Sequence, residues 1–144
     1  MAAEKTRILV CDDSDSIRLS LLRLLSQSKN FEVVATAKNG EQAIECSEMM
    51  QPDVVIMDVN MPTMNGIEAA IRIKGKLPAT MIIMFSDADD DSTIFKSLAS
   101  GVDGYCLKRF IKNLTSIIQE KITPSNPHLP EFDSVSFAVK SLCF

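Results

Sequence analysis

Histidine and glycine are scarce in this chain, and this scarcity excludes several kinds of active site. The single histidine, His128, lies in a proline-spaced segment near the C-terminus, so a Ser-His or Cys-His nucleophile pair is not expected. The five glycines form neither a Walker loop nor a GxGxxG motif, which removes the common phosphate-binding loops of nucleotide sites. Any chemistry in this protein must therefore depend on other residue types.

Long hydrophobic runs are also missing. The longest apolar runs are about five residues, whereas a membrane-spanning helix needs about 20. No apolar stretch of signal-peptide length precedes the first acidic residues. The net charge of −4 and the pI of about 5.0 give the chain no basic footprint for nucleic acid. We expect a cytoplasmic protein with no membrane partner.

The cysteines have no CxxC or zinc-like spacing. There are four of them, at positions 11, 46, 106 and 143. Because Cys11 and Cys106 lie inside apolar runs, we expect buried, reduced thiols rather than a metal site or a disulfide framework.

Short apolar runs alternate with segments of helical periodicity, which predicts βα units and a parallel sheet. The five runs expected to form strands are Ile8–Cys11, Phe31–Ala37, Val54–Met57, Met81–Phe85 and Tyr105–Leu107. The five helices are expected at about 16–28, 40–50, 67–76, from 87–91 to about 101, and 110–122. We therefore predict one doubly wound α/β domain with the flavodoxin-like strand order 2-1-3-4-5 and a ligand crevice between strands 1 and 3.

Four of the five apolar runs end in a polar residue of a type that can bind or accept a phosphoryl group. The first run leads into Asp12-Asp13, the third into Asp58, the fourth into Ser86 and the fifth into Lys108. Taken alone, each acidic segment is equally well explained by a structural role such as helix capping, and Ser86 and Lys108 are better explained as a loop hydroxyl and a solvated charge. Parallel strands, however, would bring all of them to one sheet edge. Three carboxylates at one edge need a cation, and Mg²⁺ suits them because it prefers oxygen ligands. One carboxylate could then attack phosphorus while the metal and the lysine neutralise charge.

These residues, with their spacing, resemble the CheY-like receiver domain of two-component response regulators. The resemblance rests on Asp12-Asp13, on Met-Asp-Val-Asn-Met-Pro-Thr-Met-Asn-Gly at 57–66, on Ser86, and on Gly-Tyr-Cys-Leu-Lys at 104–108. It covers about residues 6–122.

The resemblance implies a role for each site residue. Asp58 would accept a phosphoryl group from a sensor histidine kinase or a phosphotransfer protein. Asp12 and Asp13 would bind Mg²⁺ together with Asp58 and the backbone carbonyl of Asn60. Further residues would contact or sense the phosphoryl group: Ser86 and Lys108 through its oxygens, and Tyr105 as an aromatic switch, although Tyr105 could equally be a strand aromatic that fills a groove.

Two positions depart from the family pattern. Asp87 stands where the family usually has Ala or Gly at the entrance to the phosphoryl site, and we expect it to modify access. Arg109 stands where a proline is frequent. Together with Gly-Val-Asp-Gly-Tyr at 101–105, the second departure is similar to the NarL/LuxR type, whose receivers precede a helix-turn-helix output domain.

The function predicted on this basis is a phosphorylation-switched signalling domain and not an enzyme that turns over metabolites. Its partner-binding face would be helix 4, strand 5 and helix 5, its partners could include a second copy, and DNA would be contacted only through an output domain outside this chain. Three alternatives remain at this stage. A haloacid-dehalogenase-type phosphatase would need a second acid where this chain has Asn60, and a flavodoxin-like FMN protein would need a phosphate-cradling loop in place of Asp12-Asp13. A degenerate receiver that signals without phosphate is favoured by Asp87 alone.

We expect a receiver domain over 1–122, followed by a proline-spaced linker and an apolar C-terminal tail over 123–144. The tail concentrates three phenylalanines, Phe132, Phe137 and Phe144, in its last 13 residues. Because its apolar spacing fits either a strand or one helical face, periodicity does not decide its structure. Such a tail is expected to dock on its own receiver or on a second subunit, or else to begin an output domain. The alternative is a disordered end, as is common for chain termini.

Overall fold

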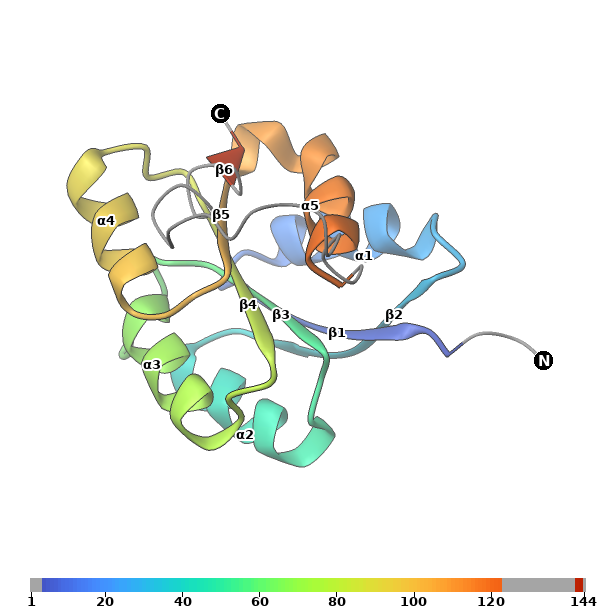
Figure 1. Ribbon diagram of the computed structural model, residues 1–144, viewed down its shortest axis with the longest axis horizontal. Helices are drawn as coiled ribbons and strands as arrows, with labels where there is room; N and C mark the ends of the chain where they lie inside the picture. The colour runs from blue at the N-terminus through green and yellow to red at the C-terminus, as the bar shows by residue number, and fades with distance from the viewer. Residues whose placement is uncertain (1–3, 123–141, 144) are drawn as a thin grey trace, which may run out of the picture.

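The computed structural model describes residues 4–122 and 142–143, which form a parallel sheet with helices on both faces (Figure 1). The strand order is β2-β1-β3-β4-β5-β6, so the predicted order 2-1-3-4-5 is confirmed and one short strand is added at the edge. The strands are β1 (Thr6–Cys11), β2 (Phe31–Ala37), β3 (Val54–Met57), β4 (Met81–Ser86), β5 (Gly104–Leu107) and β6 (Leu142–Cys143). The helices are α1 (Asp15–Ser26), α2 (Gly40–Met50), α3 (Gly66–Lys76), α4 (Asp91–Ala99) and α5 (Leu114–Ile122), with a 3₁₀ helix η1 (Lys108–Asn113) before α5.

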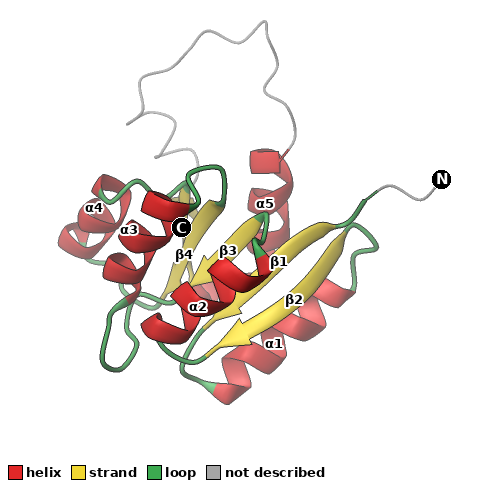
Figure 2. Ribbon diagram, turned by 90° about the horizontal axis from the view of Figure 1, so that it is seen from below, coloured by secondary structure: helices red, strands yellow, loops and turns green. Residues whose placement is uncertain are grey.

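The helices form two layers. Helices α2, α3 and α4 cover one face of the sheet, and α1 and α5 cover the other (Figure 2). Each layer has its own apolar core. Residues of β3 alternate between the cores, with Val55 and Met57 facing α2–α4 and Val54 and Ile56 facing α1 and α5. All four are fully buried, which explains why this strand appears in the sequence as a continuous apolar run rather than as an alternating one.

Side-chain caps set where the helices begin. Ser14 accepts a hydrogen bond from the Ile17 N–H, so α1 begins at Asp15, one residue before the predicted start at about 16. Asn39, Asn65 and Asp90 cap α2, α3 and α4 in the same way. Because these caps stand directly after the loops that follow β2, β3 and β4, each helix begins close to the carboxyl edge of the sheet.

The last helical segment differs from its prediction. A helix was expected over about 110–122, but η1 occupies 108–113 and only Leu114–Ile122 is α-helical. The backbone of Phe110 is non-helical, with φ −106° and ψ 35°, which interrupts a regular helix at this point. Pro124 and the tail positions 123–141 and 144 lie outside the described residues. Among the described helices, none is long and apolar enough to cross a membrane.

Candidate functional site

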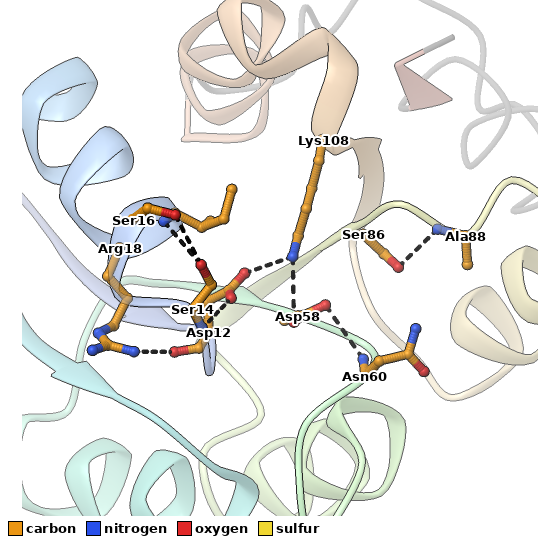
Figure 3. Close-up of polar contacts among 10 residues, drawn as sticks. Asp12, Ser14, Ser16, Arg18, Asp58, Asn60, Ser86, Ala88 and Lys108 are labelled. Carbon is orange, nitrogen blue, oxygen red and sulfur yellow. Dashed lines mark hydrogen bonds and ion pairs between the residues drawn. The ribbon is translucent and has the colours of Figure 1, made fainter.

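Strand register brings the predicted site residues together at the carboxyl edge of the sheet (Figure 3). Cys11 of β1 and Met57 of β3 are directly opposite each other, so Asp12 and Asp58 leave the sheet at the same level. A backbone hydrogen bond of 2.9 Å from the Asp58 N–H to the Cys11 carbonyl extends the pairing by one residue. Neighbouring strands lie about 4.8 Å apart, which places the two carboxylates side by side.

Three carboxylates form an oxygen-rich cluster at this edge. One carboxylate oxygen from each of Asp12, Asp13 and Asp58 lies within 4.8 Å of the others. Asp12 is fully buried and Asp58 is 4% exposed, while Asp13 faces solvent. Two buried anions at this separation repel each other strongly in a medium of reduced dielectric constant. The donor set therefore fits a hard divalent cation such as Mg²⁺, with Asp13 on the solvent side.

Lys108 supplies a positive charge inside the cluster. Its Nζ lies 2.9 Å from Asp12 Oδ2 and 3.4 Å from Asp58 Oδ2 (Figure 3). Burial opposes the charged form, but the hydrogen bond to Asp12 and the charges of Asp58 and Asp12 outweigh it, so the pKa of Lys108 is raised above its ordinary value. Lys108 therefore remains a cation at physiological pH, positioned between the two buried acids.

The carboxyl group of Asp58 is held in a partly destabilised ionised state. Burial and the charge of Asp12 raise the pKa of Asp58 to about 6, against the opposing effects of Lys108 and of the Asn60 N–H. That N–H donates to Asp58 Oδ1 at 3.3 Å. Above about pH 6 the carboxylate is ionised, which is the nucleophilic form.

The hydroxyl-bearing residues of β4 and β5 adjoin the acidic cluster. Ser86 is fully buried at the end of β4, and its Oγ accepts a hydrogen bond of 3.1 Å from the Ala88 N–H. The ring of Tyr105 is also fully buried, and its hydroxyl donates to the Ala88 carbonyl at 2.5 Å. Burial raises the pKa of the Tyr105 phenol. Both residues thus contact the loop between β4 and α4, and Tyr105 points inward in this structure.

The two departures from the family pattern both face solvent. Asp87 is exposed, next to the buried Ser86. Arg109 forms a 3.5 Å ion pair with Asp89, and each of the two side chains is more than half exposed. This pair connects the loop after β4 to the segment after β5, although exposed pairs of this kind contribute little to stability.

Arg18 is a site residue that the sequence analysis missed. It is 8% exposed, and its Nη1 donates to the backbone carbonyl of Asp12 at 2.7 Å, while its Nη2 pairs with Asp15. The signal was present in the sequence, because position 18 shares the core-facing side of α1 with Leu21 and Leu25. A charged residue at such a position usually has a buried partner.

A doubly wound fold whose carboxyl edge carries an acidic triad and a lysine defines the receiver class of response regulators. Comparison with known families agrees, because the model of the response regulator receiver domain matches residues 8–119. The chain belongs to this family, which sets aside the dehalogenase-type and flavodoxin-like alternatives.

Individual relatives include a transcriptional regulatory protein and a nitrate/nitrite response regulator protein. The chain is 37% identical over 102 residues to the transcriptional regulatory protein LnrK of Bacillus subtilis, covering 71% of this chain and 46% of that protein. It is also 37% identical over 105 residues to the nitrate/nitrite response regulator protein NarL of Escherichia coli K12, covering 73% of this chain and 49% of NarL. The chain thus spans about half the length of these curated relatives.

The fold also has close counterparts among solved structures. The receiver domain of the putative response regulator NarL from Mycobacterium tuberculosis superposes with a TM-score of 0.80 at 27% identity, covering 85% of this chain and 100% of that one. The response regulator domain of Thermotoga maritima CheB gives a TM-score of 0.73 at 30% identity, covering 83% and 94%. The expected likeness to NarL/LuxR-type receivers is confirmed.

Proposed function

We propose that this receiver domain is a phosphorylation switch in which Asp58 accepts a phosphoryl group from a sensor histidine kinase or a phosphotransfer protein. The observation that carries the proposal is the position of the Asp58 carboxylate, which lies between Lys108 and the acids Asp12 and Asp13 at a single sheet edge. Its pKa of about 6 leaves it ionised at physiological pH yet incompletely solvated, as a reactive nucleophile requires.

The transfer would form one bond and break another. A carboxylate oxygen of Asp58 attacks phosphorus, and the bond from phosphorus to the donor atom breaks, so that the electron pair leaves with the donor. Asp12, Asp13, Asp58 and the Asn60 backbone carbonyl would hold Mg²⁺, which supplies positive charge to the phosphoryl oxygens when bound. Lys108 would exchange part of its contact with Asp58 for a phosphoryl oxygen.

Acyl phosphate formation changes the charge next to the loop between β4 and α4. The Ser86 oxygen accepts the Ala88 N–H, and its hydroxyl proton would be donated to a phosphoryl oxygen. Tyr105 binds the same loop through the Ala88 carbonyl, so a shift of the loop would change the hydrogen bond that this residue of β5 makes. We propose that α4, β5 and α5 form the face whose partners change.

A role as a phosphorylation switch also suggests the binding partners of the domain and its location in the cell. Because the relatives named above are transcriptional or nitrate/nitrite response regulators, we propose DNA contact only through an output domain outside this chain, with a second copy as a further partner. The proposed location is the cytoplasm, where sensor kinases present their phosphorylated histidines. The domain would catalyse its own phosphorylation and slow dephosphorylation without turning over a metabolite.

Phosphorylation by a small donor tests the proposal directly. Incubation with acetyl phosphate and Mg²⁺ should add one phosphoryl group by intact mass, and Asp58→Asn should abolish the addition. Asp91→Asn, which removes an exposed acid from the first turn of α4, is the matched control and should be labelled like the wild type. Unchanged labelling of Asp58→Asn would overturn the assignment of the acceptor.

A further inference from the structure

The open edge of the sheet is closed by the chain's own C-terminus. Leu142 and Cys143 of β6 pair in parallel with Tyr105 and Cys106 of β5. Without this pairing β5 would be an edge strand with one row of backbone N–H and C=O groups unpaired, which is a ready template for another strand. All four residues of β5 are buried, as expected for a strand that is covered on its faces and at its edge.

We propose that the edge of β5 is a strand-docking site, which residues Leu142–Cys143 occupy in cis as a removable cover. The length of the chain permits the cis arrangement. Helix α5 ends at Ile122, and the intervening positions 123–141 can span up to about 60 Å when extended. Because α5 has nine residues and β5 four, each element is only about 13 Å long, so a connection of this reach can return from the end of α5 to the edge of β5.

The topology indicates that the cover is an addition to the fold rather than part of its core. A right-handed connection from β5 to a strand at this edge would run on the face of α3 and α4, as the preceding connections do. Helix α5 instead lies on the opposite face, beside α1 (Figure 1). A two-residue strand reached by this route is held by few backbone hydrogen bonds, so it can leave while the five other strands stay paired.

The position at which β6 docks determines which contacts its release would affect. Leu142 is in register with Tyr105, whose hydroxyl binds the loop between β4 and α4. A second protein that adds a strand to β5 would need the same row of backbone groups, so its binding and the docking of β6 exclude each other. The proposal does not depend on phosphorylation of Asp58, because it is tested on the unphosphorylated protein.

Hydrogen exchange measures the docking. In the full chain, Leu142→Pro removes a backbone N–H from β6 and disfavours its pairing, while Leu142→Val keeps a strand-forming residue. Amide exchange of residues 104–107 should become at least about fivefold faster in the proline variant, roughly the effect of losing one hydrogen bond, and stay unchanged in the valine variant. Exchange in β1 and β3 should not change, which reports that the fold is intact. Unchanged exchange of residues 104–107 in Leu142→Pro overturns the proposal.

Two native cysteines distinguish docking in cis from docking in a second copy. Cys106 and Cys143 are partners in the register, and the spacing of neighbouring strands, about 4.8 Å, falls within the Cα separation of disulfides, about 4.4–6.8 Å. With glutathione disulfide as oxidant, one thiolate forms a mixed disulfide and the other displaces the second glutathione, so two protein thiols yield one protein disulfide and two glutathione thiols.

The thiol experiment is done in a Cys46→Ser background, which removes the half-buried thiol of α2. The expected product is a monomer lighter by two hydrogen atoms, with a Cys106–Cys143 peptide after digestion. Cys143→Ser is the control and should give no such peptide. A dimer linked through Cys106 of one chain and Cys143 of another would overturn docking in cis and assign the edge to a second copy.

Discussion

Gly66 packs its backbone directly against the carbonyl group of Asp58. A Cβ atom built at position 66 would lie 1.9 Å from the Asp58 carbonyl oxygen, far inside van der Waals contact. The Gly66 N–H also donates to the Val59 carbonyl at 2.7 Å, which ties the start of α3 to the loop after β3. This close approach holds Asp58, the proposed phosphoacceptor, at the edge of the sheet, so the absence of a side chain at position 66 is a requirement of the site.

The first prediction concerns this contact. Gly66→Ala should destabilise the protein by roughly 1–3 kcal/mol or more, because the clash is with backbone and the loop must move. It should also slow phosphorylation, since Asp58 moves with the loop. Chemical denaturation and acetyl phosphate labelling measure the two effects. Gly75→Ala in the same helix is the control: its Cβ meets nothing within 4 Å, so it should stabilise by up to about 1 kcal/mol. Similar stability of the two variants would contradict the packing argument.

The second prediction concerns the pH dependence of stability. The pKa of Asp58 is raised from 3.8 in its ordinary state to about 6 in the fold, so the folded protein binds this proton more tightly than the unfolded chain does. Asp58 therefore contributes stability below about pH 4, and this contribution is lost as the pH rises through about 6. Asp58→Asn lacks this titration, so in metal-free buffer it should be more stable than the wild type by up to about 3 kcal/mol at pH 8.

The measurement is urea denaturation of both proteins at several pH values from 4 to 8, with Asp91→Asn as a control for the removal of one acidic charge. The advantage of Asp58→Asn should disappear near pH 4. A constant difference across the whole range would show that the Asp58 carboxyl group is not perturbed by its surroundings.

The third prediction concerns the metal. Mg²⁺ should bind the wild type and raise its melting temperature, because binding to the folded state alone adds to stability. Asp13→Asn should weaken binding by at least the roughly 10–100-fold that removal of an outer-shell partner costs, since Asp13 would be a direct ligand. Calorimetric titration gives the affinities, and Asp91→Asn should bind like the wild type. Equal affinities for Asp13→Asn and the wild type would place the metal elsewhere.

The fourth prediction concerns Asp87. Its exposed carboxylate adjoins Ser86, so it should repel an anionic phosphodonor and slow labelling. Asp87→Ala should accelerate acetyl phosphate labelling by roughly two- to fivefold at low ionic strength, and by less at high salt, where such charges are screened. Asp91→Ala removes the same charge from the first turn of α4, farther along the chain, and should have a smaller effect. Rates that match the wild type at every salt concentration would mean that Asp87 has no influence on access.

Sequence periodicity predicted the sheet well because the inner strands β1, β3 and β4 are buried on both faces along most of their length. The apolar runs end at the same residues as strands β1 and β3, and the acids that follow them mark the carboxyl edge of the sheet. The limits of the helices were less predictable, since the start of α1 depends on one hydroxyl, that of Ser14, and the break before α5 depends on the backbone of Phe110. Neither feature alters the hydrophobic pattern.

Two parts of the structure were not predicted in detail, namely strand β6 and the contact of Arg18, because each depends on a backbone partner. Strand β6 exists through pairing with β5, so its two residues carry no periodicity of their own. Arg18 reaches a backbone carbonyl, and a backbone acceptor leaves no mark on the residue types around it. Four site positions were predicted correctly to meet at one edge because each directly follows or ends a strand: Asp12, Asp58, Ser86 and Lys108.

The hydrogen bond from Tyr105 to the Ala88 carbonyl has a practical consequence. The chain has one tyrosine and no tryptophan, so nearly all of its intrinsic fluorescence comes from this one ring. The ring is fully buried, its hydroxyl binds the loop after β4, and the Tyr105 backbone is paired with Leu142 of β6. Any rearrangement that breaks its hydrogen bond or uncovers it will change its emission. The protein thus contains its own optical reporter on β5, next to the proposed phosphoryl site, without any added label.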